Sequence, residues 1–213
     1  HYLSSVLYIN LYFNYSSTLF LVAFHFPICY NYCEVNNMIM ISILDIEHKK
    51  QHSHAQALLK ECLGKCGVDY DETMTAQGEY GKPYLPDYPH IHYNLSHASG
   101  IAACMAAGKE CGIDCEKIRP TRTNVMRRAF SETEKALVEN SPESERDLMF
   151  TRLWTLKEAY GKAIGKGINY SMNVTDFSFN GGEITTAVAG YRFRQYIIKG
   201  EYIVSTCLRD VDI

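Results

Sequence analysis

The chain has 213 residues and a mass of 24.3 kDa, enough for one large domain or two small packed ones, each with an apolar core. Hydrophobic residues make up 46% and charged residues 21%, which is typical of a soluble globular protein, and we expect a cytoplasmic location without membrane attachment. A net charge of -3 gives no basis for a nucleic-acid partner.

Residues 1–37 differ in composition from the remainder. Tyr, Phe, Leu, Asn and Ser dominate this leader, Glu34 is its only charged side chain, and the apolar run at 19–26 is too short to span a membrane. It also lacks the basic start of a signal peptide. We expect the natural protein to start at Met38 or Met40, with a spurious translation upstream. The alternative is an added hydrophobic segment that packs on the domain.

From residue 40 the chain shows alternating strand and helix patterns. Its apolar content predicts a strand at 40–47, and helical spacing predicts a helix at 53–63. Three prolines between 81 and 89 predict a loop that presents Lys82. A short strand then brings Ser96 and His97 to its end, on opposite faces, so these two residues do not form a hydrolase pair.

A β-hairpin is predicted for residues 101–118. In its second strand Asp114 and Glu116 face the side opposite to Ile113 and Cys115, with their Cα atoms about 6.5 Å apart. Two carboxylates on one face of a mostly apolar strand need a compensating cation. Mg²⁺ is the simplest candidate, because it takes one or two protein carboxylates and completes its shell with water and phosphate. The alternative is an edge strand with a solvated outer face.

The later chain reads as helices followed by an antiparallel meander. Ser131 is a candidate N-cap with Glu134 at the third helical position. Helices are expected at 124–130, at 132–138 and from 144 to about 164, and strands at 174–179, 184–189, 191–198 and 202–208.

In both halves of the chain a helix is followed by strands. We therefore predict an α+β fold of two similar subdomains with a pseudo-twofold relation. Each subdomain is expected to pack a small antiparallel sheet on a long helix. The predicted limits are 38–115 for a shortened N-terminal subdomain and 116–213 for a C-terminal subdomain.

The stretch WTLKEAYGKAIGKG, residues 154–167, predicts an amphipathic helix that ends near Gly165 and Gly167. Its polar face carries one acid and several ammonium groups, which alone could form a solvated surface. The eight cysteines include three pairs spaced C-x-x-x-C, which indicates neither a zinc ribbon nor a redox motif. We expect free buried thiols.

Five motifs occur in a consistent order: GKP at 81–83, NLSH at 94–97, GIDCE at 112–116, FSETE at 130–134, and the helix at 154–167. Together they resemble the 4'-phosphopantetheinyl transferases, specifically the surfactin-synthetase-activating type. Each motif alone is weak, whereas GIDCE combined with W-x-x-K-E-A-x-x-K-x-x-G-x-G is specific. The resemblance implies transfer of the phosphopantetheine arm of coenzyme A onto a serine of an apo acyl or peptidyl carrier protein, with release of adenosine 3',5'-bisphosphate.

The resemblance also implies roles for single residues. Mg²⁺ would be held against the pyrophosphate of coenzyme A by Asp114, Glu116 and Glu158. Lys157 and Lys162 would take pyrophosphate oxygens. Glu158 would also be the general base, so the catalytic set is Glu158, Lys162 and Asp114. Further family positions that contact coenzyme A are matched by Lys82, Pro83, Ser96 and His97, with His97 at the 3'-phosphate. Glu134 matches an acid that assists the metal or the base.

The amino-terminal half departs from the family because the expected basic clamp for the 3'-phosphate has no arginine. Approximate substitutes are Lys49, Lys50, His52 and His54, and since lysine lacks the bidentate geometry of arginine we expect weaker coenzyme A binding. An acidic carrier would dock on Arg119, Arg122, Arg127 and Arg128, or these arginines form a solvated helix face.

Two other functions compete with the transferase. One is a carrier-binding pseudoenzyme, and the other is a metal-dependent nucleotide pyrophosphatase. Because the chain contains both halves of the resemblance, we expect a monomer with its site between them.

Overall fold

The computed structural model describes residues 37–43, 48–167 and 170–210. The leader predicted at 1–37 therefore falls almost wholly outside the described residues, whereas Met38 and Met40, the two expected starts of the natural protein, are described. The strand expected at 40–47 appears as β1 (Met38–Ile43), and the rest of its predicted length is also outside them.

The first unit is a three-stranded antiparallel sheet in the order β1-β5-β4 with one helix on it. Its elements are α1 (His48–Lys65), β4 (His92–Ala98) and β5 (Ile101–Ala107), besides β1. Apolar residues of α1 such as Leu58, Leu59 and Leu63 pack on the alternate positions of β5 and form the first core. The stretch between α1 and β4 holds a short turn of helix at Glu72–Met74 and the two-residue strands β2 (Ala76–Gln77) and β3 (Pro83–Tyr84).

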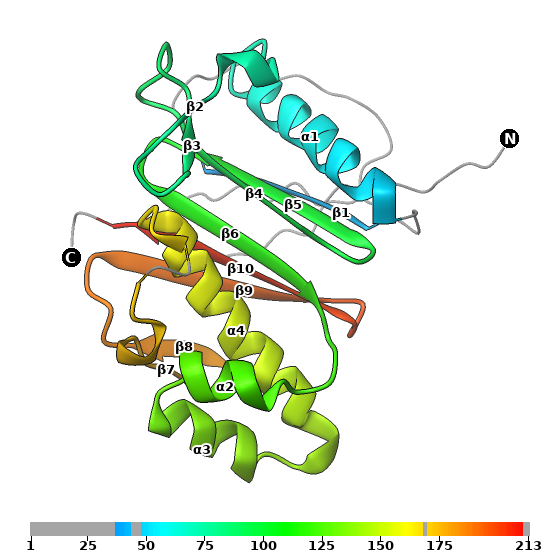
Figure 1. Ribbon diagram of the computed structural model, residues 1–213, viewed down its shortest axis with the longest axis vertical. Coiled ribbons are helices and arrows are strands. Elements are labelled where there is room, and N and C mark those ends of the chain that lie inside the picture. Colours follow the sequence, from blue (N-terminus) through cyan, green and yellow to red (C-terminus); the bar gives the residue numbers. More distant parts are fainter. Residues whose placement is uncertain (1–36, 44–47, 168–169, 211–213) are drawn as a thin grey trace, which may run out of the picture.

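The second unit has a three-stranded antiparallel sheet in the order β6-β10-β9. Its main elements are β6 (Cys111–Lys117), α4 (Arg146–Ala163), β9 (Tyr191–Ile198) and β10 (Tyr202–Arg209). At the far end of α4 in Figure 1 lie α2 (Thr123–Ala129), α3 (Glu132–Asn140), β7 (Phe177–Asn180) and β8 (Glu183–Thr186). Single helical turns occur at Glu143–Glu145 and Met172–Val174.

The two units share one topology. In each, a first strand is followed by an 18-residue helix and then by a hairpin whose last strand takes the centre of the sheet. The predicted α+β fold of two similar subdomains is therefore confirmed. The sheets divide between β5 and β6, so the expected limit at residues 115 and 116 falls inside β6, and we keep the exact subdomain limits as a proposal.

Two predicted strand pairings are wrong. The segments at 101–118 do not form a hairpin, because β5 is already flanked on both edges by β1 and β4, so β6 pairs with β10 instead. The later strands do not form one meander either. β10 lies between β6 and β9, which leaves β7 and β8 to pair with each other as a separate two-stranded sheet.

The molecule is layered, with α1 on one side, the two sheets in the middle and α4 on the other side (Figure 1). Between the sheets lie Ile39 and Ile41 of β1 together with Ile113 and Cys115 of β6. Because side chains alternate along a strand, the remaining positions of β6 face α4. This alternation is the one predicted for Asp114 and Glu116.

Side chains of β4 join the two sheets. The Ile113 amide donates to Asn94 Oδ1 at 2.9 Å, and the Cys115 amide donates to Ser96 Oγ at 3.3 Å. Asn94 and Ser96 therefore satisfy donors on β6, which is an edge strand. These contacts fix β6 against the first unit, and the acidic face of β6 lies where both units meet.

Two further expectations concern the whole chain. None of the six cysteines within the described residues forms a disulfide bond, and five of them are buried while Cys66 is half-buried. Cys29 and Cys33 lie outside the described residues. Among the described helices, none has the length and apolar character that crossing a membrane requires.

Candidate active site

The acidic face of β6 meets α4 at close range. At Gly112 a Cβ atom would overlap the carbonyl oxygen of Ala159, so only glycine allows the helix to approach the strand this closely. Asp114 and Glu116 follow on the same face of β6, while Glu158 and Lys162 lie one helical turn apart on α4. The close packing brings carboxylates from two distant segments together.

Asp114 is the centre of this cluster and is only 5% exposed. Its Oδ1 atom accepts from Lys162 Nζ at 2.7 Å and from Ser96 Oγ at 2.9 Å. Lys162 Nζ also donates to Ser96 Oγ at 2.9 Å, which closes a triangle of three side chains. The buried Oδ2 atom has no hydrogen-bond partner among the described residues. An unpartnered buried carboxylate oxygen is costly unless a ligand satisfies it.

The carboxylates perturb one another electrostatically. Burial, and then the negative charge of Asp114, raise the pKa of Glu158 to about 7, although Lys162 opposes the shift. The pKa of Glu116 is also raised, by burial and then by Asp114. Burial disfavours the ammonium of Lys162, yet attraction to Asp114 outweighs it and raises the pKa of Lys162. The mutual effects show that Asp114, Glu116 and Glu158 share one local environment.

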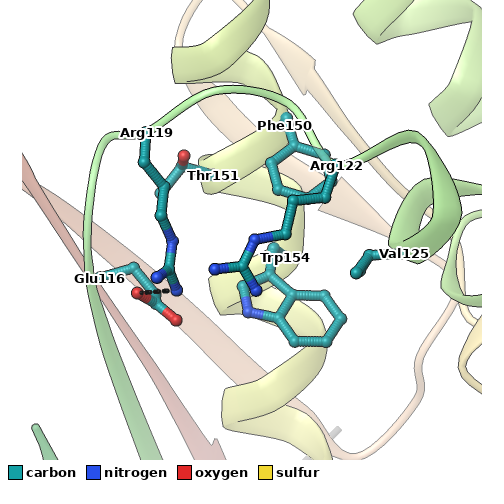
Figure 2. Close-up of a pocket in the computed structure, with 7 residues that line it drawn as sticks. All are labelled: Glu116, Arg119, Arg122, Val125, Phe150, Thr151 and Trp154. Carbon is teal, nitrogen blue, oxygen red and sulfur yellow. Dashed lines mark hydrogen bonds and ion pairs between the residues drawn. The ribbon is translucent and has the colours of Figure 1, made fainter. Parts of the chain in front are cut away.

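Glu116 has a cationic partner of its own. Arg119 Nη2 lies 2.6 Å from Glu116 Oε2, as the dashed line in Figure 2 shows. Both residues line a pocket beside the acidic face. Its wall also includes Arg122, whose guanidinium group lies next to Trp154, and the other lining residues are Val125, Phe150 and Thr151. The pocket thus combines an apolar wall from α2 and α4 with a basic rim.

The donor chemistry of this cluster suits a hard divalent cation. Three carboxylates lie beside only two cationic side chains, Lys162 and Arg119, and the buried Oδ2 atom of Asp114 has no hydrogen-bond partner among the described residues. The cluster therefore has an excess of negative charge. Within the described ranges, however, no three His, Cys, Asp or Glu side chains are already placed to hold one metal ion. At least one of the carboxylates must therefore move before all three can share a cation.

The expected contact of Lys157 with pyrophosphate needs correction. Lys157 has no exposed surface, and its Nζ atom lies 2.8 Å from Glu134 Oε2, which is equally buried. The ammonium also donates to the carbonyl oxygens of Met172 and Thr175 at 2.7 and 2.6 Å. These partners hold Lys157 on the side of α4 that faces the core of the second unit, so the ammonium cannot reach a substrate in the cleft.

Glu134 has a structural role at the same place. Its Oε2 atom accepts from the Ser131 amide at 2.9 Å, and Ser131 Oγ accepts from the Glu134 amide at 3.1 Å, which confirms the predicted cap of α3. The Oε1 atom accepts from the Phe177 amide at 3.0 Å. With all these bonds in a fully buried position, Glu134 does not lie beside Asp114 to assist a metal or a base.

The GKP loop is attached where β6 and α4 meet. Lys82 Nζ donates to the carbonyl oxygen of Ala163, the last residue of α4, at 2.6 Å, and to that of Cys111 at 3.1 Å. A cation at the carboxyl end of a helix is favourable. Burial lowers the pKa of Lys82. Pro83 follows at the start of β3 and pairs in register with Gln77.

The residues expected at the 3'-phosphate separate into two groups. His97 is exposed on β4, with its ring centroid 5.8 Å from that of His52 on α1, so these two imidazoles share one surface. His54 instead contacts Ser42 Oγ through Nε2 at 2.9 Å, and burial lowers the pKa of its imidazole. The side chains of Lys49 and Lys50 are outside the described part. Ser96, next to His97, points the other way, to Asp114.

One contributor was missed at the sequence level. Asn94 belongs to the NLSH motif, and its side chain joins β4 to β6 beside Asp114. Its position two residues before Ser96, on the same face of a strand, was the available signal. The four arginines expected to meet a carrier are all exposed, namely Arg119, Arg122, Arg127 and Arg128.

The segment that forms this site is similar in sequence to proteins of known activity. Residues 110–207, which contain β6, α4 and most of β10, match the model of the 4'-phosphopantetheinyl transferase superfamily. A 4'-phosphopantetheinyl transferase from Bacillus subtilis is 33% identical over 140 residues, covering 63% of this chain and 62% of the relative. Over this part of the chain the protein is similar to 4'-phosphopantetheinyl transferases.

Other similar proteins match a smaller share of the chain. An L-aminoadipate-semialdehyde dehydrogenase-phosphopantetheinyl transferase from Mus musculus is 31% identical, over 53% of this chain and 41% of the relative. A holo-(acyl-carrier-protein) synthase structure from Bacillus anthracis, in complex with CoA (3',5'-ADP), has a TM-score of 0.41 at 21% identity, covering 47% of this chain and 96% of that one. The chain spans between 40% and 62% of the length of the curated relatives it matches.

Proposed function

We propose that this protein transfers the 4'-phosphopantetheine arm of coenzyme A to a serine of an apo acyl or peptidyl carrier protein and releases adenosine 3',5'-bisphosphate. The observation that carries the proposal is the meeting of Asp114, Glu116 and Glu158 beside Lys162. The segment that holds them lies within the family match at 110–207. Curated relatives with this activity in their names support the same reaction.

Mg²⁺ is the cofactor we propose, with Asp114, Glu116 and Glu158 as its protein ligands. When bound, it would offset the charge of the pyrophosphate and favour in-line displacement. The unpartnered Oδ2 atom of buried Asp114 supports this assignment. So do the raised pKa values of Glu116 and Glu158, because a carboxylate whose charge is disfavoured by its neighbours gains most from a shared cation.

The chain's own residues have distinct tasks in the proposed transfer. The serine oxygen of the carrier forms a bond to the phosphorus next to pantetheine, and the bond from that phosphorus to the adenosine 3',5'-bisphosphate oxygen breaks. Glu158 accepts the hydroxyl proton, directly or through a water molecule. Lys162 turns its ammonium towards the leaving phosphate, while Ser96 keeps Asp114 in place.

Coenzyme A is proposed to lie across the junction of the two units. Lys82 is attached to both β6 and α4, and Pro83 fixes the backbone beside it. His97 and His52 together offer imidazole donors to the 3'-phosphate, on the opposite face of β4 from Ser96. We further propose that the protein acts as a cytoplasmic monomer, since both units of the fold come from one chain.

A mass-spectrometric assay tests the reaction. The protein is incubated with an apo carrier protein, coenzyme A and Mg²⁺, and we expect the carrier to gain one phosphopantetheine. A carrier whose acceptor serine is replaced by alanine is the matched control and should stay unmodified. Cleavage of coenzyme A without any carrier would indicate a nucleotide pyrophosphatase instead. Carrier binding without any product would indicate a pseudoenzyme and would refute the proposed transfer.

A further inference from the structure

The acidic cluster is stabilised by two cations that the protein itself supplies. Lys162 Nζ lies 2.7 Å from Asp114 Oδ1, and Arg119 Nη2 lies 2.6 Å from Glu116 Oε2. Two of the three carboxylates proposed to hold Mg²⁺ are thus paired with cationic side chains. A divalent ion that binds all three must compete with these pairs, because a carboxylate oxygen close to an ammonium or guanidinium group is a weaker ligand.

The two pairs differ in how easily they can separate. The Lys162 and Asp114 side chains are 24% and 8% exposed, and Ser96 bonds to both. The Arg119 side chain is 43% exposed and Glu116 is 16% exposed. Arg119 also lies beyond the end of β6, in the stretch that leads to α2, where no sheet bonds hold its backbone. Arg119 can therefore leave its partner without disturbing the core.

We propose that Arg119 is an exchangeable counter-ion, which pairs with Glu116 until a divalent cation binds and takes this carboxylate over. The inference rests on the proposed function, because it takes Asp114, Glu116 and Glu158 as the ligands. It explains why no three acidic side chains of the described residues are already placed around one point. The Oδ2 atom of Asp114 has no hydrogen-bond partner among the described residues, so no bond to it has to break before it binds such a cation.

The freed guanidinium group can turn into solvent, because the Arg119 side chain is already 43% exposed. Arg119 lines the same pocket as Arg122 and Trp154, and Figure 2 shows that this pocket opens beside the Glu116 carboxylate. The proposed exchange involves the side chains of Arg119 and Glu116, and the backbone of β6 keeps its pairing with β10.

Replacing Arg119 by glutamine should tighten cation binding. An exposed ion pair contributes about 0.2 to 1 kcal/mol, which corresponds to a change of about 1.4- to 5-fold in a dissociation constant. We expect Arg119→Gln to lower the Kd for Mn²⁺ by about two- to fivefold. The matched control is Arg122→Gln, because Arg122 lines the same pocket and its charge also acts on Glu116, but its guanidinium group forms no ion pair with Glu116 within the described chain.

The experiment measures free Mn²⁺ by electron paramagnetic resonance in titrations of the full chain, with thermal unfolding as a check that each variant is folded. A lower Kd for Arg119→Gln than for Arg122→Gln supports the exchange, and Arg119→Lys, which keeps the charge, should fall between wild type and Arg119→Gln. Equal Kd values for the two glutamine variants overturn it, as does a wild-type protein that binds no Mn²⁺. The transfer assay on the same preparations separates the two proposals, since carrier modification by wild type with equal Kd values refutes the exchange alone.

Discussion

Replacing Glu158 by glutamine should stabilise the protein in the absence of metal while nearly abolishing transfer. Burial and the charge of Asp114 raise the pKa of Glu158 from 4.5 to about 7. A raised acid pKa in the folded state means that the folded protein holds this proton more tightly than the unfolded chain does. Ionisation of Glu158 therefore opposes folding, and glutamine removes that opposition.

The size and the pH range of this effect follow from the same pKa values. The difference between 4.5 and about 7, converted at about 1.36 kcal/mol per pKa unit, gives at most about 3.4 kcal/mol. Glu158 is only partly buried, so solvent screening reduces the expected gain to about 1 to 2 kcal/mol. Below pH 4.5 the carboxyl group is protonated in both states and glutamine gains nothing. The gain grows as the pH rises towards 7 and is complete above about 8.

Urea unfolding at pH 5 and pH 8, with a chelator present, measures this difference. The expected outcome is a free energy of unfolding that exceeds wild type by about 1 to 2 kcal/mol at pH 8 and by much less at pH 5. Glu132→Gln is the control, because the Glu132 side chain is 91% exposed and should show no such dependence. Equal stability of wild type and Glu158→Gln at pH 8 would refute the electrostatic account, and normal transfer by the variant would refute the role of Glu158.

Two further substitutions test the packing that positions the site. Lys157→Met leaves the buried carboxylate of Glu134 uncompensated, so urea unfolding should show a loss of about 3 to 5 kcal/mol, with part recovered in the double variant with Glu134→Gln. If Lys157 instead binds pyrophosphate, the single variant will keep wild-type stability and lose coenzyme A affinity. Gly112→Ala forces α4 away from β6, because the new Cβ overlaps the Ala159 carbonyl, and should destabilise the protein by several kcal/mol (about 3 or more). Gly64→Ala meets no neighbour and should instead stabilise α1 by about 0.5 to 1 kcal/mol, so equal thermal unfolding of the two alanine variants would contradict the close packing at Gly112.

The local patterns of this chain predicted the faces of its elements well. The alternation in β6 separates Asp114 and Glu116 from Ile113 and Cys115, and the structure buries the latter pair between the sheets. This succeeds because a strand's period of two residues is a property of the segment itself. The cap at Ser131 was predictable for the same reason, since its hydrogen bonds join residues three apart.

Strand partners were not predictable in the same way. A short turn between 107 and 111 favours a hairpin on local grounds, yet β5 has no free edge once β1 and β4 flank it. The partner of β6 is β10, almost a hundred residues later in the chain, and nothing within β6 specifies that choice. The competition between edges is decided by the whole fold, so the sequence of one hairpin-like segment cannot reveal it.

In the W-x-x-K-E stretch the adjacent charged residues Lys157 and Glu158 have different roles, because they face different sides of α4. Residues along a helix are separated by about 100° around its axis, so Lys157 lies about 200° from Ala159, the residue whose backbone meets Gly112 of β6. Lys157 must therefore face away from β6 and into the core, where it contacts the buried Glu134. Glu158 lies only about 100° from the contact with Gly112 and remains at the edge of the strand, within reach of the charge of Asp114. The motif contains both residues, but the close contact of α4 with the glycine on the neighbouring strand determines which of them can contact a substrate.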